Sequence, residues 1–234
     1  GYTLSKSLDT RSFDPAFTVA ATGNGQSASS TPFDIANRKL NYALSDFDRT
    51  HVVQSYWVYE LPFGRGKRMA GDAGPWLNRL VGGWQITGFA TIHGGRPFTA
   101  YSGFATIGNT VQSTANCNGC TRDMGDVRQE GGFTWYFDPA ERGKFQPTGA
   151  GDFGNTGRNF FRGPGRFGMD AALLQPTSIT ERVNLEIRAD VTNLTNTPEF
   201  GFPTTTYTST LFGRIGGTIN SASRRFQLGA KVRF

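Results

Sequence analysis

The sequence predicts an all-β fold of antiparallel up-and-down strands, and three observations support this prediction. Hydrophobic residues make up only 37% of the 234 residues, although the chain has 20 Phe and 31 Gly. Low hydrophobicity with many aromatics and glycines favours short strands and polar loops over packed helices. Several segments alternate strictly between apolar and polar residues, which is the period of a strand with one apolar and one wet face. Long polar stretches separate these segments.

The first half of the chain contains three predicted strands. Gly1–Asp9 is the first, His51–Leu61 the second and Gly83–Phe98 the third. The second strand carries Val53, Trp57, Tyr59 and Leu61 on one parity. The third carries Trp84, Ile86, Ala90 and Ile92 on one parity.

The second half contains three more strands, two of which alternate most regularly. Phe167–Thr177 is the least regular of them, and the hairpin connection Ser178–Glu181 follows it. The next strand alternates between apolar and charged residues. We expect its apolar side to face lipid or a protein core, and its charged side to face water. Its apolar residues are Val183, Leu185, Ile187, Ala189 and Val191. The last strand ends the chain with the apolar residues Phe226, Leu228, Ala230, Val232 and Phe234.

Three long polar stretches connect the strands, over residues Thr10–Asp48, Thr99–Arg166 and Asn196–Ser223. Loops of this length are uncommon inside compact soluble domains but normal on the extracellular side of outer-membrane barrels. The sequence therefore predicts part of an outer-membrane-type barrel with about six to ten strands. Two to four of these are expected near Phe98–Ile107, Phe133–Phe137 and Thr205–Phe212. With the C-terminus on the periplasmic side, the Pro62–Gly82 connection is also periplasmic and is unusually long for that side.

Two cysteines occur, as Cys117-Asn118-Gly119-Cys120. A CxxC pair is compatible with a redox motif, half of a zinc site or a local disulfide. We favour a disulfide formed in an oxidising compartment, because the pair lies among loop residues and both histidines are distant in the sequence. We therefore predict no metal site and no cofactor.

Several aromatic and charged residues have two interpretations each. Trp57, Tyr59 and Trp84 fit interfacial aromatics, and a sugar-stacking platform is the alternative. The aspartates Asp46 and Asp48 fit a solvated turn, and a loop calcium site is the alternative. The arginines Arg158, Arg162 and Arg166 fit loop charges that bind backbone carbonyls, and a path for anions is the alternative.

The motifs of the common enzyme classes are missing from the sequence. It has no Gly-x-Ser-x-Gly elbow and no His-Glu-x-x-His. Gly64-Arg65-Gly66-Lys67 lacks the remaining pattern of a phosphate loop, so we interpret it as a cationic turn. The net charge of +6 comes with no nucleic-acid-binding motif. We therefore expect neither an enzyme nor a nucleic-acid partner.

An ordered series of short motifs covers most of the chain and resembles the C-terminal region of Oar-like TonB-dependent receptors, which carry a carboxypeptidase-regulatory-like N-terminal domain. The motifs include Leu44-Ser45-Asp46-Phe47-Asp48-Arg49, Leu61-Pro62-Phe63-Gly64-Arg65-Gly66, Gly82-Gly83-Trp84-Gln85, Arg162-Gly163-Pro164-Gly165 and Asp190-Val191-Thr192-Asn193-Leu194-Thr195-Asn196. The resemblance implies a large antiparallel barrel, a terminal Phe that is recognised during insertion, and transport across the outer membrane powered through TonB.

The family's plug, TonB box and regulatory domain have no counterpart in these residues, so we expect residues 1–234 to form one domain, a C-terminal barrel segment. No secretion signal is recognisable at Gly1, which suggests a processed or fragmentary form. Since the smallest membrane barrels have eight strands, both edges of a six-stranded sheet would be open.

Two functional hypotheses therefore remain for the chain. The first is a transport-related segment in the bacterial outer membrane, with lipid and strands of the parent chain as partners. The second is an extracellular, self-assembling fibre subunit, with other copies of itself as partners. A soluble β-sandwich that binds a ligand is a weaker third hypothesis.

Overall fold

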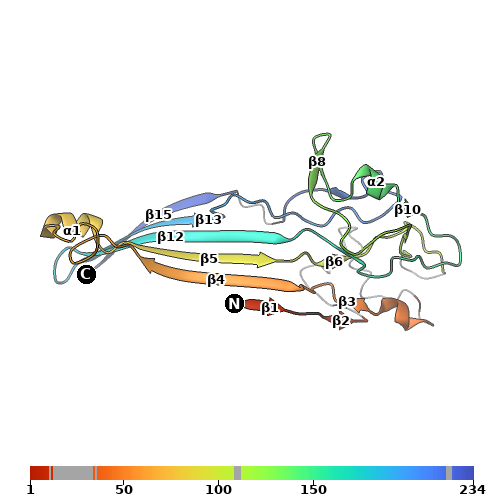
Figure 1. The fold of residues 1–234 in the computed structure, drawn as a ribbon, viewed down its shortest axis with the longest axis horizontal. Helices are drawn as coiled ribbons and strands as arrows, with labels where there is room; N and C mark the ends of the chain where they lie inside the picture. The colour runs from red at the N-terminus through yellow and green to blue at the C-terminus, as the bar shows by residue number, and fades with distance from the viewer. Residues whose placement is uncertain (11, 13–33, 35, 108–111, 220–222) are drawn as a thin grey trace.

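The protein is elongated, with a strand region at one end and a thick layer of loops at the other (Figure 1). The structure is a computed structural model, and it describes residues 1–10, 12, 34, 36–107, 112–219 and 223–234. Among these residues there is no helix with the length and apolar character of a transmembrane span.

Six strands form one antiparallel sheet in the order β1-β4-β5-β12-β13-β15, in which every strand pairs antiparallel with its neighbours. Their bounds are β1 Tyr2–Leu4, β4 His51–Glu60, β5 Gln85–His93, β12 Arg166–Ser178, β13 Asn184–Thr192 and β15 Arg225–Arg233. The up-and-down topology predicted from the sequence is thus confirmed. The described sheet does not close, because β1 and β15 each have a neighbour on one side only.

The predicted strand boundaries hold within a few residues, with three corrections. Gly1–Asp9 is not one strand, because the pairing with β4 stops at Leu4 and β2 (Leu8–Asp9) pairs with β3 (Ala43–Leu44) in a separate sheet. The strand predicted over Gly83–Phe98 ends at His93. Val183 precedes β13 and belongs to the hairpin, where its carbonyl accepts a hydrogen bond from the Ile179 amide at 2.9 Å.

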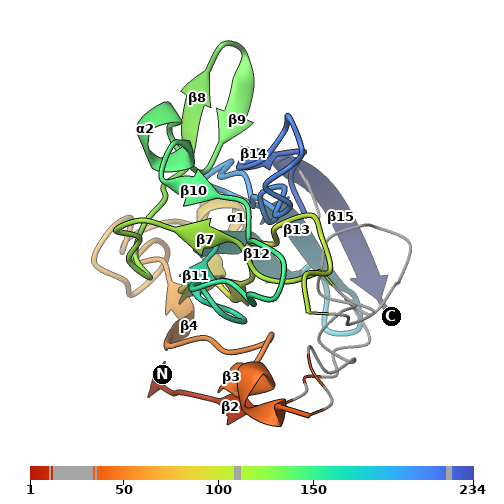
Figure 2. The same ribbon diagram turned by 90° about the vertical axis from the view of Figure 1, so that its right-hand side faces the viewer.

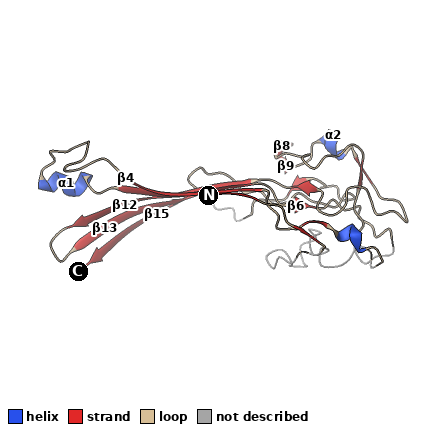
Figure 3. Ribbon diagram, turned by 60° about the horizontal axis from the view of Figure 1, so that its bottom comes forward, coloured by secondary structure: helices blue, strands red, loops and turns tan. Residues whose placement is uncertain are grey.

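The two connections expected to be periplasmic, β4–β5 and β12–β13, lie at the end that holds the C-terminus, and the described parts of the long stretches lie at the opposite end (Figures 1 and 3). The β12–β13 connection is a tight hairpin, as predicted. The β4–β5 connection contains an unpredicted helix, α1 (Pro75–Val81).

Short paired strands organise the loop layer. They are β6 (Pro97–Phe98) with β11 (Phe161–Arg162), β7 (Asn116–Cys117) with β10 (Phe145–Gln146), and β9 (Phe133–Trp135) between β8 (Arg128–Glu130) and β14 (Arg214–Ile215). A four-residue helix, α2 (Pro139–Arg142), and a 3-10 turn (Arg38–Asn41) complete the layer (Figure 2). The extra strands predicted near Phe98 and Phe133 are therefore loop ladders rather than barrel strands, and Thr205–Phe212 forms no strand.

The hydrophobic core lies in the loop layer and not against the sheet. Phe137 is fully buried, and its ring centroid lies 5.2 Å from that of Phe145 and 5.4 Å from that of Phe161. Phe98 and Phe212 pack on the same ring. Aromatic pairs at these distances add to the free energy of burying their apolar surface, so this cluster holds the loops together.

We predict that Phe137→Ala destabilises the loop layer by about 3–5 kcal/mol, because it leaves a cavity in the centre of the aromatic cluster. Chemical unfolding followed by loop-specific proteolysis measures the loss. Phe104→Ala is the matched control, since Phe104 is 57% exposed and its removal is expected to change stability by less than about 0.5 kcal/mol. Equal effects of the two substitutions would contradict a loop-centred core.

Candidate functional site

Strand register sorts the side chains of the six-stranded sheet onto two unlike faces. On β13 and β15, Val191 pairs with Phe226 and Ala189 with Leu228, so the two predicted apolar parities share one face. The same register continues across the other strands. The larger residues of this apolar face are Tyr2, Leu4, Val53, Trp57, Tyr59, Ile86, Ile92, Phe167, Met169, Leu173, Leu185, Ile187, Val191, Phe226, Leu228 and Val232.

Much of the apolar face is open to its surroundings. Leu228 is 83% and Phe226 71% exposed, and in the described part of the chain no second sheet packs against them. An exposed apolar surface of this extent marks contact with lipid or with another protein surface. A β-sandwich, which would bury this face in its own core, is not what the described residues form.

The predicted interfacial aromatics lie on or next to the apolar face. Tyr59 is one residue from the end of β4, and Trp84 directly precedes β5 and donates from its indole nitrogen to the Leu80 carbonyl at 2.9 Å. Trp57 lies further from the strand end, across from Gly88. Its ring fills the space above Gly88, where a Cβ atom would lie 2.2 Å from the indole.

The opposite face is mainly polar and charged. Arg188 pairs with Asp190 at 2.7 Å, and Arg233 lies 3.6 Å from Glu186 on the neighbouring strand. This polar face also carries Tyr56 directly opposite Phe89, which the sequence pattern did not reveal as a pair. Alternation of this kind is what a barrel with a wet lumen requires.

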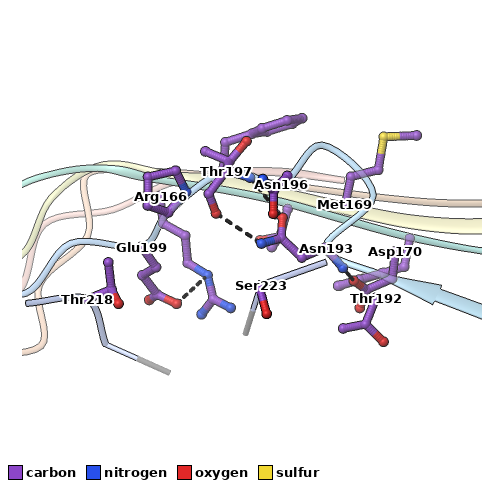
Figure 4. A pocket seen from close by; sticks show the side chains of 15 residues that line it. Arg166, Met169, Asp170, Thr192, Asn193, Asn196, Thr197, Glu199, Thr218 and Ser223 are labelled. Carbon is purple, nitrogen blue, oxygen red and sulfur yellow. Dashed lines mark hydrogen bonds and ion pairs between the residues drawn. The ribbon is translucent and has the colours of Figure 1, made fainter. Parts of the chain in front are cut away.

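A pocket of about 520 Å³ lies where the polar face meets the loop layer (Figure 4). Arg166 and Glu199 point toward one another in it and form an ion pair at 3.1 Å. Asp170 accepts a hydrogen bond from the Asn193 amide at 2.8 Å, which fixes the loop after β13. Its walls combine an ion pair, amides and hydroxyls with apolar residues such as Phe89 and Pro198, a mixed lining that can bind a solute through both polar and apolar contacts.

Further cations line a small cavity next to this pocket, and the two share Arg166 and Glu199. The Arg49 guanidinium contacts the His93 ring and donates to the Gly94 carbonyl at 3.4 Å. Burial lowers the pKa of Arg49, and Arg166 adds to this effect while Glu199 opposes it. Arg166 therefore lines both cavities, and its ion pair with Glu199 lies between them.

The other two predicted arginines stabilise the loop layer. The Arg158 side chain is 1% exposed, and it pairs with Asp9 at 2.8 Å and with Asp46 at 3.0 Å. It also donates to the Asn41 carbonyl at 2.9 Å. Arg162 donates to the Gly95 carbonyl at 3.1 Å and pairs with the buried Asp48 at 2.6 Å.

These contacts correct the interpretation of Asp46 and Asp48 as a solvated turn. Both residues are buried, at 4% and 2% exposure, because each carboxylate neutralises an arginine that comes from more than 100 residues further along the chain. The Asn159 side chain donates a further hydrogen bond to Asp46 at 2.6 Å. The described residues contain no group of three or more His, Cys, Asp or Glu side chains suited to a metal ion.

The structure joins Cys117 and Cys120 in a disulfide within the loop layer. Cys117 packs against the aromatic cluster. The Asn155 side chain accepts a hydrogen bond from the Cys117 amide at 2.8 Å and donates to its carbonyl at 3.0 Å. The bridge therefore belongs to the folded loop layer rather than to a flexible surface turn.

Comparison with known families matches residues 1–227 to a family described as an outer membrane beta barrel domain. No curated protein and no solved structure matches the chain.

We predict that Arg158→Met lowers the stability of the loop layer by about 3–5 kcal/mol, because it leaves the buried Asp46 and the half-buried Asp9 without their counter-charge. Urea unfolding monitored by proteolysis of the loops measures this loss. Arg38→Met is the matched control, since Arg38 is exposed and its replacement is expected to have little effect. An unchanged urea midpoint for Arg158→Met would exclude a structural role for this network.

Low pH should weaken the ion-pair network around Arg158. Burial alone would raise the pKa of the Asp9 carboxyl, but hydrogen bonds from Ser12 and Arg158 outweigh it and hold that pKa below its ordinary value of 3.8. The stabilisation is therefore complete above about pH 4 and lost as the pH falls through the lowered pKa. Unfolding midpoints between pH 6 and pH 2.5 measure this loss. Asp9→Asn should flatten the dependence, and an unchanged slope would contradict the assignment to Asp9.

Proposed function

The chain belongs to the family of outer-membrane β-barrel domains, and on this premise we propose that it is the C-terminal barrel segment of a TonB-dependent-receptor-like transporter of the Oar-like kind. The family match supports the barrel and the outer-membrane location. TonB coupling and transport rest on the ordered motifs of the sequence. The proposal gives the chain no catalytic role.

The observation that carries the proposal is the separation of the two faces by strand register. The apolar face supplies a lipid-facing wall, since Leu185, Ile187 and Val191 continue into Val232, Ala230 and Phe226 of the neighbouring strand. The polar face then lines a water-filled interior, as in other membrane barrels. The pocket around Arg166 and Glu199 then lies at the extracellular end of this interior, where a solute would first be bound.

A closed barrel needs more strands than the six of this sheet, because the smallest membrane barrels have eight. We propose that strands from another part of the same polypeptide pair with β1 and β15. A plug and a TonB box would have to come from that polypeptide too, since no energy coupling is possible without them.

The open edges also favour one alternative, an extracellular fibre subunit. In the described part of the chain no strand pairs with the outer edge of β15, which is nine residues long and lies next to the exposed Phe226 and Leu228. Such an edge pairs readily with a strand of another chain. If β15 of one copy paired with β1 of the next without closing, a filament would grow.

We predict that spin labels on successive single cysteines from Phe226 to Arg233 alternate in environment when the chain is reconstituted in phospholipid vesicles. Labels at the even positions should be most accessible to oxygen, which is concentrated in lipid, because they lie on the apolar face. Labels at the odd positions should be most accessible to a water-soluble nickel chelate. The bonded Cys117 and Cys120 leave no native thiol to compete for the label.

Two results would overturn the transporter proposal. One is equal accessibility of the two parities in vesicles. The other is the assembly of filaments in detergent-free buffer, visible by negative-stain electron microscopy, with the even positions shielded from both reagents. The second result would support the fibre subunit instead.

A further inference from the structure

The connection between β4 and β5 is an unusual feature of the periplasmic end. It runs from Leu61 to Trp84 and contains a glycine-rich turn followed by α1. Its cations are Arg65, Lys67, Arg68 and Arg79, against the single acid Asp72, which gives the segment a net charge of +3 (4 − 1). Figure 3 shows α1 at the same end of the molecule as the C-terminus.

Helix α1 exposes apolar side chains that a water-facing helix would not carry together. Trp76 is 79%, Leu77 51% and Leu80 67% exposed. Spacings of one, three and four residues place these three side chains on one side of the helix. The Arg79 guanidinium lies 5.7 Å from the centre of the Trp76 ring, so the apolar side is bordered by a cation.

A seven-residue helix is not stable by itself, and the sheet holds this one in place. Gln175, which is 3% exposed, donates from its side-chain amide to the carbonyls of Arg79 and Leu80, at 2.8 Å each. The same nitrogen lies 3.2 Å from the Gly82 carbonyl. These are the carbonyls that a helix end leaves unsatisfied, so Gln175 fixes the position of the C-terminal end of α1.

The position of Gln175 shows which face of the sheet carries the helix. Gln175 pairs with Ile187 and therefore has the parity of the apolar face. Thr177, on the same parity, donates to the Arg79 carbonyl at 3.1 Å. The C-terminal end of α1 is thus attached to the apolar face, at the end of the sheet that holds the C-terminus.

The cationic turn is attached to the helix. The Arg65 amide donates to the Asn78 side chain at 2.5 Å, which links the turn to α1. Lys67 pairs with Glu60 at 3.2 Å, whereas the structure gives no carboxylate partner to Arg65 or Arg68 among the described residues. Apolar side chains bordered by cations, next to a lipid-facing wall, form the arrangement of an interfacial membrane anchor.

We propose that Leu61–Trp84 is an anchor that binds the periplasmic leaflet of the outer membrane through anionic phospholipid headgroups. Trp76, Leu77 and Leu80 enter the boundary between headgroups and acyl chains. Arg65 and Arg68 bind the headgroup phosphates, and Lys67 exchanges its exposed pair with Glu60 for a phosphate contact. The anchor fixes the depth of the barrel in the bilayer, and it rests on the proposed function because it needs the apolar face to be in lipid.

The test uses a spin label at Leu77→Cys in the whole chain, reconstituted in phosphatidylcholine vesicles with or without 30% phosphatidylglycerol. We expect the label to lie at headgroup depth, with accessibility to the nickel chelate at least about twofold lower than that of a label at Arg38→Cys in the loop layer. Phosphatidylglycerol should lower this accessibility further, and 1 M NaCl should reverse the added effect because salt screens the attraction.

Charge variants identify the side chains that bind the anionic headgroups. Arg65→Gln/Lys67→Gln/Arg68→Gln should abolish the response of the Leu77→Cys label to phosphatidylglycerol. The matched control Arg38→Gln/Lys39→Gln/Lys144→Gln removes three exposed charges at the loop end and should leave that response intact. Gln175→Leu should free the C-terminal end of α1 and raise the mobility of the Leu77→Cys label. The labels on β15 show independently whether the sheet of this variant is folded.

The outcomes separate the anchor from the transporter proposal. If the β15 labels alternate but the Leu77→Cys label is as accessible to the chelate as the loop label, the anchor is wrong and the barrel stands. A phosphatidylglycerol response that survives the triple variant would also overturn it. If the β15 labels do not alternate, both proposals fall together.

Discussion

The antiparallel register of the six-stranded sheet is the constraint on which the rest of the structure depends. Side chains alternate between faces with a period of two, so shifting one strand by one residue would move its apolar set to the wrong side. The pairs Val191–Phe226 and Leu173–Ala189 show that the register keeps the faces distinct across three strands. This one feature produces a wall with an apolar and a polar side.

The sheet has no core of its own, and this explains why the loops have one. Its apolar face is exposed within the described chain, so packing inside the protein cannot hold the long connections in place. The loop layer instead buries Phe98, Phe137 and Phe161 together and neutralises Arg158 with Asp9 and Asp46. Contacts between residues far apart in sequence fix the loops around the pocket. In these fixed loops Glu199 lies where it can pair with Arg166 at the start of β12.

The sequence predicted the strands well because strand periodicity is a local property. Leu185 and Leu228 reveal their faces through their immediate neighbours, and no tertiary contact is needed to recognise the pattern. The loop contacts have no such signature, since Asp46 and Arg158 are 112 positions apart in the sequence. Helix α1 escaped prediction for another reason: it is seven residues long, flanked by glycines, and held by Gln175 from a strand more than 90 residues away.

The exposed faces and edges mean that the stability of this chain depends on its surroundings. Leu228 and Phe226 contribute little to folding while they face water, and each would contribute roughly 1.5–3 kcal/mol on full transfer to an apolar environment. Among the described residues no strand pairs with the outer edge of β15, so away from water its outward backbone groups would need a further strand. In the proposed barrel, lipid on the apolar face and a strand on each edge would supply these missing contacts, whereas the loop layer has a core of its own.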